Sequence, residues 1–467
     1  MEGPSMEQYT GTPLQLQNFE VDKVWNGRVK GVKTFVLKGH LTNEVHKERC
    51  PFCGCRRMHS NGRRTTSLKH LAVGGFQIQV EVKYTRWECQ VCHACFRSHI
   101  PFKAKGHRAT KLFLKQVLAK VSGGEAVGRC ARELHVNRNL VKEVDGRRLE
   151  SLAGDMKPKR YSPYISVDEF LLHKGHRYAT VVVDYCSGES LFATQGRTHG
   201  QMLEFFRFVG DDFMRHVVAV SMDMNASYAK AFKELHPHIK VVYDGFHIVK
   251  NYNDMVLTGI RRAEQRRLVE AMSRAKADHD RGLYRELRDE YRLFKGSRYL
   301  VLSNRSTLEL KDRACAEHNR ALFERYEMKG LKIPIGKRYL PTRSIERLGD
   351  VLSANERLQT AYNLGEMLKS ALKCRDLRAF DEDMPKWLSM ARAAGCEELD
   401  RFCRLLENHW DGIRNRVLYN MSNGPLEGTN CLIKNIRRQS YGIRDDRYFF
   451  LKIWEATRRH PKHRLVS

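Results

Sequence analysis

Two pairs of cysteines constrain the fold of the N-terminal part of this chain more than any other feature. The stretch "RCPFC" carries Cys50 and Cys53, and "ECQVC" carries Cys89 and Cys92. Each C-x-x-C pair suits a tight knuckle that points two thiolates at one tetrahedral zinc ion, and two knuckles complete a four-sulfur structural site. Between the pairs, "FQIQVEVKY" alternates apolar and polar residues, as a half-buried strand does. This pattern predicts a zinc ribbon over residues 46–102 that binds one structural Zn²⁺.

The other cysteines leave alternatives open. Cys55 and Cys95 could replace one of the four ligands, and reduced thiols or a redox pair would need no metal. The chain has 13 cysteines, an odd number, and its start "MEGPSMEQYT" lacks the basic-then-apolar layout of a signal peptide, so no disulfide framework is expected. Residues 1–45 precede the ribbon as a segment with no predicted role.

The charge balance points to a polyanionic partner. The 467 residues suffice for roughly three domains. They carry 83 Lys and Arg against 54 Asp and Glu, a formal charge of +29, which favours nucleic acid over an anionic membrane. No run of about 18 apolar residues indicates a membrane span. We therefore expect a cytoplasmic, nucleoid-associated protein with no membrane partner.

A helical pattern begins at Thr110. The stretches "TKLFLKQVLAKV" and "GEAVGRCAREL" read as two helices, and Asn137 is positioned to cap a third. Two short helices across a tight turn, followed by a basic helix, predict a helix-turn-helix over residues 103–155 whose last helix enters a major groove. A small basic bundle that only packs is the alternative. The predicted DNA contacts in this domain are Arg138, Asn139, Lys142, Arg147 and Arg148.

Residues 160–254 predict the first part of an α/β core. "YISVDEF", "RYATVVVDY" and "SLFATQ" read as three strands, with a turn at "CSGE" between the last two. A helix, the strand "HVVAVSMDM", another helix and the strand "KVVYDGF" follow. Three strands and then alternating helices and strands predict a mixed sheet with helices on its faces.

Two acids end strands of this sheet. Asp168 follows the first strand and Asp223 the fourth, at the carboxyl side where α/β sheets place their sites. Their side chains can meet only if these two strands are neighbours. Asp244 stands three residues before His247 in "YDGFHIVKN". A histidine packed against an aspartate at a strand end is the favoured interpretation, and a metal site is the alternative.

From residue 255 to about residue 420 the pattern is almost wholly helical, with one break at "GLKIPIGKRYLPTRS". The stretch "SNGPLEGTN" then places Glu427 before a basic run. Lys434, Arg437 and Arg438 in that run are predicted to bind DNA phosphates, and a generic basic tail is the alternative.

Together these motifs resemble the DDE transposases of bacterial insertion sequences, and among them the family abbreviated ISL-three. The resemblance covers about residues 48–455 and depends on the motifs and their order. The motifs are "CPFC" with "CQVC", "SVDEF", "VSMDMNASYAKAF", "VVYDGFHIVKN" and "SNGPLEGTNCLIKNIRRQSYGIRD".

The resemblance implies a multidomain α/β fold. A ribonuclease-H-like core would be interrupted by a helical insertion over residues 255–420 and completed by residues 421–467, behind the ribbon and the helix-turn-helix. The first catalytic acid of the family falls on Asp168, the second on Asp223 and the final glutamate on Glu427. Asp244 and His247 match an Asp-x-x-His element that follows the fifth strand in many of these enzymes, and we expect this pair to support the catalytic site rather than to bind metal.

The implied activity is transposition. The enzyme would bind double-stranded DNA at the terminal inverted repeats of its element, cleave strands and transfer them to target DNA, as a homodimer or larger assembly. Two Mg²⁺ (or Mn²⁺) ions held by Asp168, Asp223 and Glu427 would assist the attack on the phosphodiester. A DNA-binding regulator derived from a transposase is one alternative, although all three acids are present. A nuclease that cuts without joining is the other, although a helix-turn-helix favours sequence-specific ends.

Overall fold

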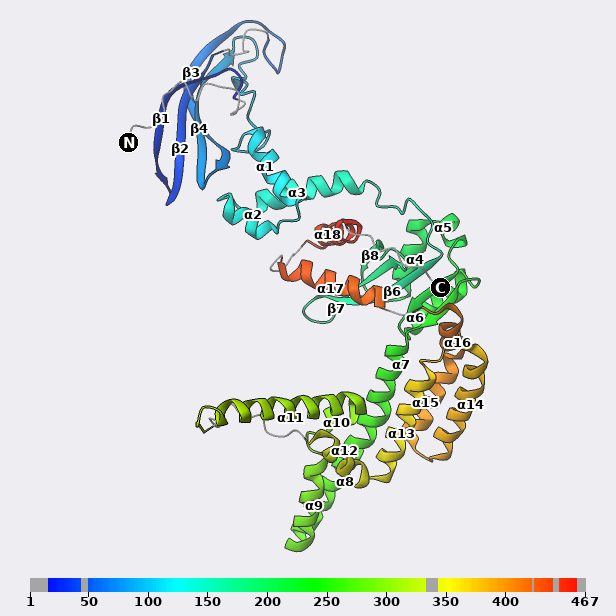
Figure 1. Ribbon diagram of the computed structural model, residues 1–467. Helices are drawn as coiled ribbons and strands as arrows, with labels where there is room; N and C mark the ends of the chain where they lie inside the picture. Colours follow the sequence, from blue (N-terminus) through cyan, green and yellow to red (C-terminus); the bar gives the residue numbers. More distant parts are fainter. Residues whose placement is uncertain (1–15, 43–48, 333–342, 422–423, 440–444, 460–467) are drawn as a thin grey trace. The chain divides into compact units, whose positions relative to one another are not determined.

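The computed structural model describes residues 16–42, 49–332, 343–421, 424–439 and 445–459 (Figure 1). The chain divides into two compact units, which are described separately. The first unit combines residues 1–156 with residues 432–456, and the second combines residues 157–431 with residues 457–467.

The first unit begins with a five-stranded sheet in the order β1-β2-β4-β3, with β5 paired to β4. Strands β2 and β4 run parallel, and the other pairs are antiparallel. The bounds are β1 Phe19–Val29, β2 Val32–Leu41, β3 Met58–Val73, β4 Phe76–Cys89 and β5 Cys95–Arg97. The strand that the alternation around residues 76–84 predicts is confirmed as β4.

The sequence pattern did not reveal that β1 and β2 extend the ribbon's sheet. Both residues of the turn between them, Lys30 and Gly31, have positive φ angles of 51° and 82°. A two-residue hairpin turn of this type needs positive φ at both positions, which glycine adopts without strain. Leu37 and Leu41 of β2 are buried in the same apolar cluster as Val80 of β4. The segment before the cysteines is therefore part of the ribbon's core.

Three helices follow, as the sequence predicts: α1 Lys111–Ser122, α2 Val127–Glu133 and α3 Arg138–Ala153. The Asn137 side chain accepts a hydrogen bond from the backbone N–H of Asn139 at 2.8 Å, which confirms it as the cap of α3. Phe113, Val117 and Val141 are fully buried between these helices. They hold the three helices in one small core.

The C-terminal helix α18, Asp446–Arg459, packs on α3. Tyr448 and Leu451 bury their side chains against Leu149 and Ala153. Of the predicted last segment of the core, residues 421–467, the part from 432 to 456 groups with the first unit. Apolar burial between α3 and α18 accounts for that grouping.

The second unit contains a five-stranded sheet in the order β10-β9-β6-β7-β8. Strands β6, β7 and β8 are antiparallel, and β9 and β10 run parallel to β6. The strand bounds are β6 Tyr164–His173, β7 Arg177–Asp184, β8 Ser190–Gln195, β9 Ala219–Met222 and β10 Lys240–Tyr243. The helices among them are α4 His199–Val209, α5 Asp211–Arg215, α6 Ala226–Leu235 and α7 Gly245–Tyr252. The predicted mixed α/β sheet is confirmed.

The rest of the second unit is helical, as predicted for residues 255–420. A π-helical turn, η4 Asn253–Leu257, joins α7 to the helices beyond it. These are α8 Thr258–Ala277, α9 Arg281–Phe294, α10 Arg298–Leu302, α11 Arg305–Glu327, α12 Ser344–Ser353, α13 Glu356–Ala371, α14 Leu377–Ala393, α15 Glu397–Asn408 and α16 Trp410–Tyr419. Most of the predicted break at "GLKIPIGKRYLPTRS" lies outside the described residues.

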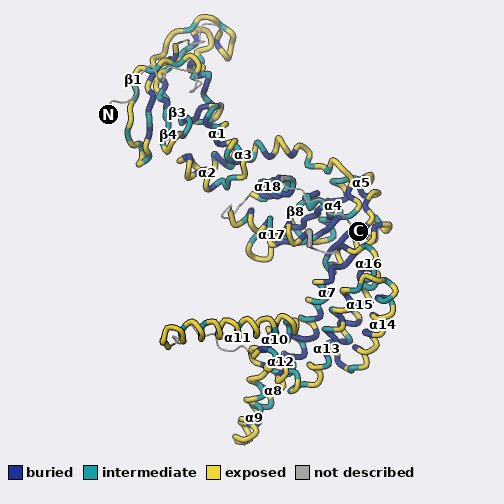
Figure 2. The backbone as a smooth tube through the Cα atoms, viewed as in Figure 1, coloured by how far each residue is buried: buried dark blue, intermediate teal, exposed yellow. Residues whose placement is uncertain are grey.

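The helical part leaves the sheet through α7 and returns to it through α16 (Figure 1). Asn415 of α16 donates a hydrogen bond to the backbone oxygen of Val241 in β10 at 2.9 Å. Helix α11 is mostly exposed, and Leu308 is its buried residue (Figure 2). No helix of the described ranges is long and apolar enough to cross a membrane.

The last helix before α18 is α17, Gly424–Gln439, which carries Glu427 in its first turn. Residues 422 and 423, which open the "SNGPLEGTN" motif, lie outside the described part of the chain.

Candidate functional site

Strands β6 and β9 are neighbours, so the side chains of Asp168 and Asp223 can lie close together. The strands pair in parallel, and the last pair along them is Ser166 with Ser221. Asp168 and Asp223 each lie two residues beyond that pair, so they occupy equivalent places in the two chain segments. Asp223 directly follows β9, as predicted, but the prediction that Asp168 ends its strand is wrong, because β6 continues to His173 through its pairing with β7. Burial, and then the charge of Asp223, raise the pKa of Asp168 to about 6. The two carboxylates are therefore electrostatic neighbours.

Asp168 is held by two hydrogen-bond donors. The backbone N–H of Glu169 donates to its Oδ1 at 2.7 Å, and the side-chain amide of Asn430 donates to its Oδ2 at 2.5 Å. Asn430 comes from α17, far away in the sequence, and was not among the predicted site residues. Its position three residues after Glu427 is the one signal that could have identified it, because residues three apart share a helix face.

Asp223 is held by His247. The Nδ1 atom of His247 lies 2.6 Å from Asp223 and 3.2 Å from Asp244. Burial alone would lower the pKa of His247, but the two carboxylates beside its ring outweigh burial and raise it to about 9. At neutral pH an imidazolium ion therefore lies between Asp223 and Asp244. The position of His247 is consistent with the predicted role of the Asp244–His247 pair in supporting the site.

Glu427 is on the helix that reaches this site, but its carboxylate does not join the other two. Its side chain is exposed. Within the described residues, only the four cysteines bring three or more potential metal-ligand atoms within 4.8 Å of one another. The structure therefore brings Asp168 and Asp223 together with Asn430, and places Glu427 one helical turn before Asn430.

The carboxylate oxygens of Asp168 and Asp223 are suitable ligands for a hard divalent cation. Mg²⁺ and Mn²⁺ prefer carboxylate oxygens, and two carboxylates are adjacent here. The raised pKa of Asp168 shows that its negative charge is only partly compensated by the surrounding protein groups. A cation bound to Asp168 would supply that compensation.

The four predicted zinc ligands converge. Sulfur–sulfur distances are 3.7 Å for Cys50 with Cys92 and 3.5 Å for Cys53 with Cys89. Tetrahedral zinc with Zn–S bonds of about 2.3 Å requires sulfurs roughly 3.8 Å apart. The sulfurs therefore fit a structural Zn²⁺.

The pKa values of the thiols in this cluster differ. Backbone N–H groups of Cys92 and Val91 lower the pKa of Cys89 to about 6. The backbone N–H of Cys55 lowers the pKa of Cys53, but the neighbouring thiols outweigh it and raise that pKa to about 12. Four thiolates this close need a cation to neutralise them.

Cys55 and Cys95 lie outside the four-sulfur cluster. The sulfur of Cys55 accepts from the backbone N–H of Arg57, and that of Cys95 accepts from the side chain of Asn61. The group of converging ligand atoms contains neither of them. The alternative in which one of them replaces a ligand is therefore not supported.

Most of the predicted DNA contacts on α3 face outward. Arg138, Asn139 and Arg147 are exposed. Arg147 forms an ion pair with Glu143 at 2.7 Å, one turn earlier on α3, and Lys142 pairs with Asp445 at 3.0 Å. Both pairs are accessible to solvent, so a phosphate can compete for these cations.

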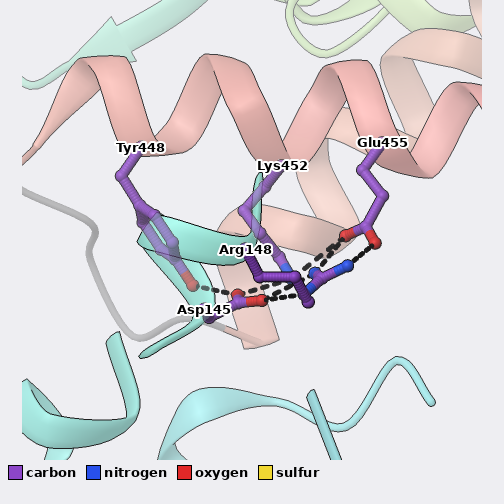
Figure 3. Close-up of polar contacts among 5 residues, drawn as sticks. All are labelled: Asp145, Arg148, Tyr448, Lys452 and Glu455. Atoms are coloured by element: carbon purple, nitrogen blue, oxygen red, sulfur yellow. Dashed lines mark hydrogen bonds and ion pairs between the residues drawn. The ribbon is translucent and has the colours of Figure 1, made fainter. Parts of the chain in front are cut away.

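Arg148 is a correction to the predicted set, because it points into the protein (Figure 3). Its side chain is 10% exposed and forms ion pairs with Asp145 at 2.6 Å and Glu455 at 2.5 Å. Asp145, which is fully buried, also accepts hydrogen bonds from Tyr448 at 2.6 Å and Lys452 at 3.1 Å. Arg148 therefore links α3 to α18 instead of contacting DNA.

On α17, Lys434 and Arg438 are exposed and Arg437 is half-buried. The three side chains predicted to bind phosphates are therefore accessible to solvent to different degrees. Their part in DNA binding remains a prediction.

Comparison with known proteins agrees with these features. A family model for ISL3 transposases, described as transposase, matches residues 165–453, and a model described as the zinc-finger of transposase IS204/IS1001/IS1096/IS1165 matches residues 46–92. The chain is similar to the transposase for insertion sequence element IS1001 of Bordetella parapertussis, with 27% identity over 409 residues, 87% of this chain and 88% of that protein. It is also similar to the transposase for IS1557 of Mycobacterium tuberculosis, with 23% identity over 286 residues, 60% of this chain and 56% of that protein. Because the first model matches more than half of the chain, the chain belongs to the ISL3 (ISL-three) family of insertion-sequence transposases.

Proposed function

We propose that this transposase binds the terminal inverted repeats of its element and cleaves and transfers DNA strands at the site on β6 and β9. The observation that carries the proposal is the pairing of these two parallel strands, which sets Asp168 beside Asp223. Adjacent carboxylates, one within β6 and one directly after β9, suit metal-assisted attack on a phosphodiester.

Asp168, Asp223 and Glu427 would hold the divalent ions, two Mg²⁺ or Mn²⁺. Such ions lower the pKa of an attacking water or 3′-hydroxyl and neutralise the leaving oxygen. Glu427 belongs to this set because its helix reaches Asp168 through Asn430, one turn further on. Its position in the first turn of α17 leaves its carboxylate exposed to solvent and substrate.

The neighbouring side chains orient these acids. Asn430 and the backbone of Glu169 fix the two oxygens of Asp168. His247 fixes Asp223 and is itself fixed by Asp244. Because Nδ1 of His247 is occupied by these carboxylates, we assign His247 and Asp244 to positioning Asp223, not to direct attack on DNA.

DNA would be bound by basic residues outside this centre. The exposed residues of α3 would enter the groove of the end sequence, held in place by the helical core and the zinc ribbon. Those residues are Arg138, Asn139 and Arg147, together with the half-buried Lys142. Lys434, Arg437 and Arg438 of α17 would bind phosphates, and two element ends would be held by a homodimer or larger assembly.

The test is a strand cleavage and joining assay on labelled end DNA with Mg²⁺. We expect the full chain to nick end DNA and join it to a target, and Asp168→Ala to do neither while binding end DNA with near wild-type affinity. Asp289→Asn, an exposed acid on α9, is the matched control and should keep both activities.

Three outcomes separate the readings. Cleavage without joining would favour a nuclease, and binding without cleavage would favour a regulator. Wild-type cleavage by Asp168→Ala would overturn the assignment of the centre.

A further inference from the structure

A cleft of about 500 Å³ opens next to His247 in the second unit. Its walls come from α7, from the start of α11, from α13 with the residues just after it, and from α16. Residues that matter here are Gly245, Phe246, Lys369, Lys373 and Arg416. The cleft is therefore separate from the acids proposed to hold the divalent ions.

Phe246 places an exposed aromatic ring close to the acidic centre. The residue is 62% exposed, and its ring centroid lies 5.4 Å from that of His247. His247 in turn lies 2.6 Å from Asp223. Single exposed apolar side chains are common on protein surfaces. What sets Phe246 apart is its place on the wall of the cleft and beside the acidic centre, where its ring face is available for stacking.

Arg416 provides a cation in the same cleft. It donates to the backbone oxygen of Leu372, and its Nε is buried and has no hydrogen-bond partner among the described residues. A Cβ atom at Gly245 would lie 2.8 Å from that Nε, so the close approach of Arg416 to α7 depends on glycine.

The lysines of the cleft differ in availability. Lys369 is paired with Glu366 at 2.7 Å, so its charge is compensated. Lys373 is exposed at the rim. Arg416 and Lys373 therefore give the cleft a positive character beside an apolar ring.

We propose that this cleft binds one nucleotide of the DNA strand next to the phosphodiester that is cleaved, with its base stacked on Phe246 and its phosphate bound by Arg416 and Lys373. The inference rests on the proposed function and specifies how its substrate is held. Every base presents an aromatic face, so stacking would tolerate any sequence, and the guanidinium and ammonium groups match a phosphate.

The experiment is a double-mutant cycle between the base and the ring. Binding of the full chain to end DNA is measured by fluorescence anisotropy without Mg²⁺, and single abasic positions are scanned around the cleavage point. For the wild type, removing one particular base should weaken binding about 10- to 100-fold. For Phe246→Ala, removing the same base should change affinity less than about 2-fold, because the stacking partner is already gone.

Two variants act as controls. Phe246→Trp keeps an aromatic surface and should restore sensitivity to the abasic position. Phe323→Ala removes an exposed ring on α11, 51% exposed, and should leave that sensitivity unchanged. Lys373→Ala should weaken binding to intact and abasic DNA alike and reduce the salt dependence by roughly one phosphate contact.

The outcomes distinguish this inference from the proposed function. If no abasic position weakens binding, or if Phe246→Ala keeps the wild-type sensitivity, the cleft does not hold the base. Failure of the wild type to bind or cleave end DNA would instead overturn the proposed function itself.

Discussion

Replacing Asp168 with asparagine should stabilise the protein when no divalent ion is supplied. In the folded chain the pKa of Asp168 is raised from 3.8 to about 6, mainly by burial and then by Asp223. The folded state therefore binds the proton more tightly than the unfolded state, and stability falls as pH rises through this window. Above pH 6 the ionised carboxylate of Asp168 lowers the free energy of unfolding by up to roughly 3 kcal/mol, at about 1.4 kcal/mol per pKa unit. An asparagine side chain is neutral at every pH and avoids that cost.

The assay is thermal unfolding of the wild type and Asp168→Asn in buffer with zinc but without Mg²⁺, at pH 4.5, 6 and 7.5. We expect the variant to be more stable by about 2 °C at pH 4.5, where roughly a third of the cost is already present, and by as much as about 6 °C at pH 7.5, at roughly 2 °C per kcal/mol for a unit of this size. The hydrogen bonds need not be lost, because the amide of Asn430 can rotate to accept from the new side chain.

Adding Mg²⁺ should then reverse the order. A ligand present at 1,000 times its dissociation constant stabilises the folded state by about 4.1 kcal/mol, which exceeds the roughly 3 kcal/mol that the ionised carboxylate costs, and only the wild type has the charged ligand for it. The reasoning is refuted if Asp168→Asn is less stable than the wild type at pH 7.5 without Mg²⁺. It is also refuted if Mg²⁺ stabilises both proteins equally.

Other predictions address the zinc site, α3 and α17. Cys89→Ser should lower bound zinc from one per chain to near none by elemental analysis, whereas Cys95→Ser should retain it; equal zinc in both would contradict the four-cysteine site. Arg147→Ala should weaken end-DNA binding and reduce its salt slope by about one, with little change in unfolding free energy. Arg148→Ala should instead lower the unfolding free energy of the first unit by about 3–5 kcal/mol, because it leaves Asp145 and Glu455 buried with fewer partners. Asn430→Ala should reduce the rate of cleavage more than end-DNA affinity, and the reverse pattern would argue against its hold on Asp168.

The sequence revealed those features that local patterns determine. Alternating residues predict β4, helical spacing predicts α1 to α3, and the cysteine spacing identifies the zinc ligands. Asp168 and Asp223 could be proposed because both follow apolar stretches of the sequence, but a sequence does not state which strands are neighbours. The parallel pairing of β6 with β9 supplies that information.

What the sequence could not reveal depends on contacts between distant segments. β1 and β2 lack a motif of their own, and their place is determined by packing of Leu37 and Leu41 in the ribbon's core. Arg148 and Arg147 are adjacent and chemically identical, yet only Arg148 faces Glu455, about three hundred residues further on. The hydrogen bond from Asn430 to Asp168 has the same long-range origin.

The most direct test of the proposed metal-dependent centre is a metal-specificity switch at Asp223. Asp223→Cys replaces a hard oxygen ligand with a softer sulfur, which disfavours Mg²⁺ and is better tolerated by Mn²⁺. Asp244→Cys is the control, because Asp244 contacts His247 and is not assigned as a ligand. We predict that Asp223→Cys cleaves end DNA with Mn²⁺ but not with Mg²⁺, and that Asp244→Cys shows no such switch. Equal activity of Asp223→Cys in both metals, or no activity in either while DNA binding persists, would contradict the assignment of Asp223 as a metal ligand.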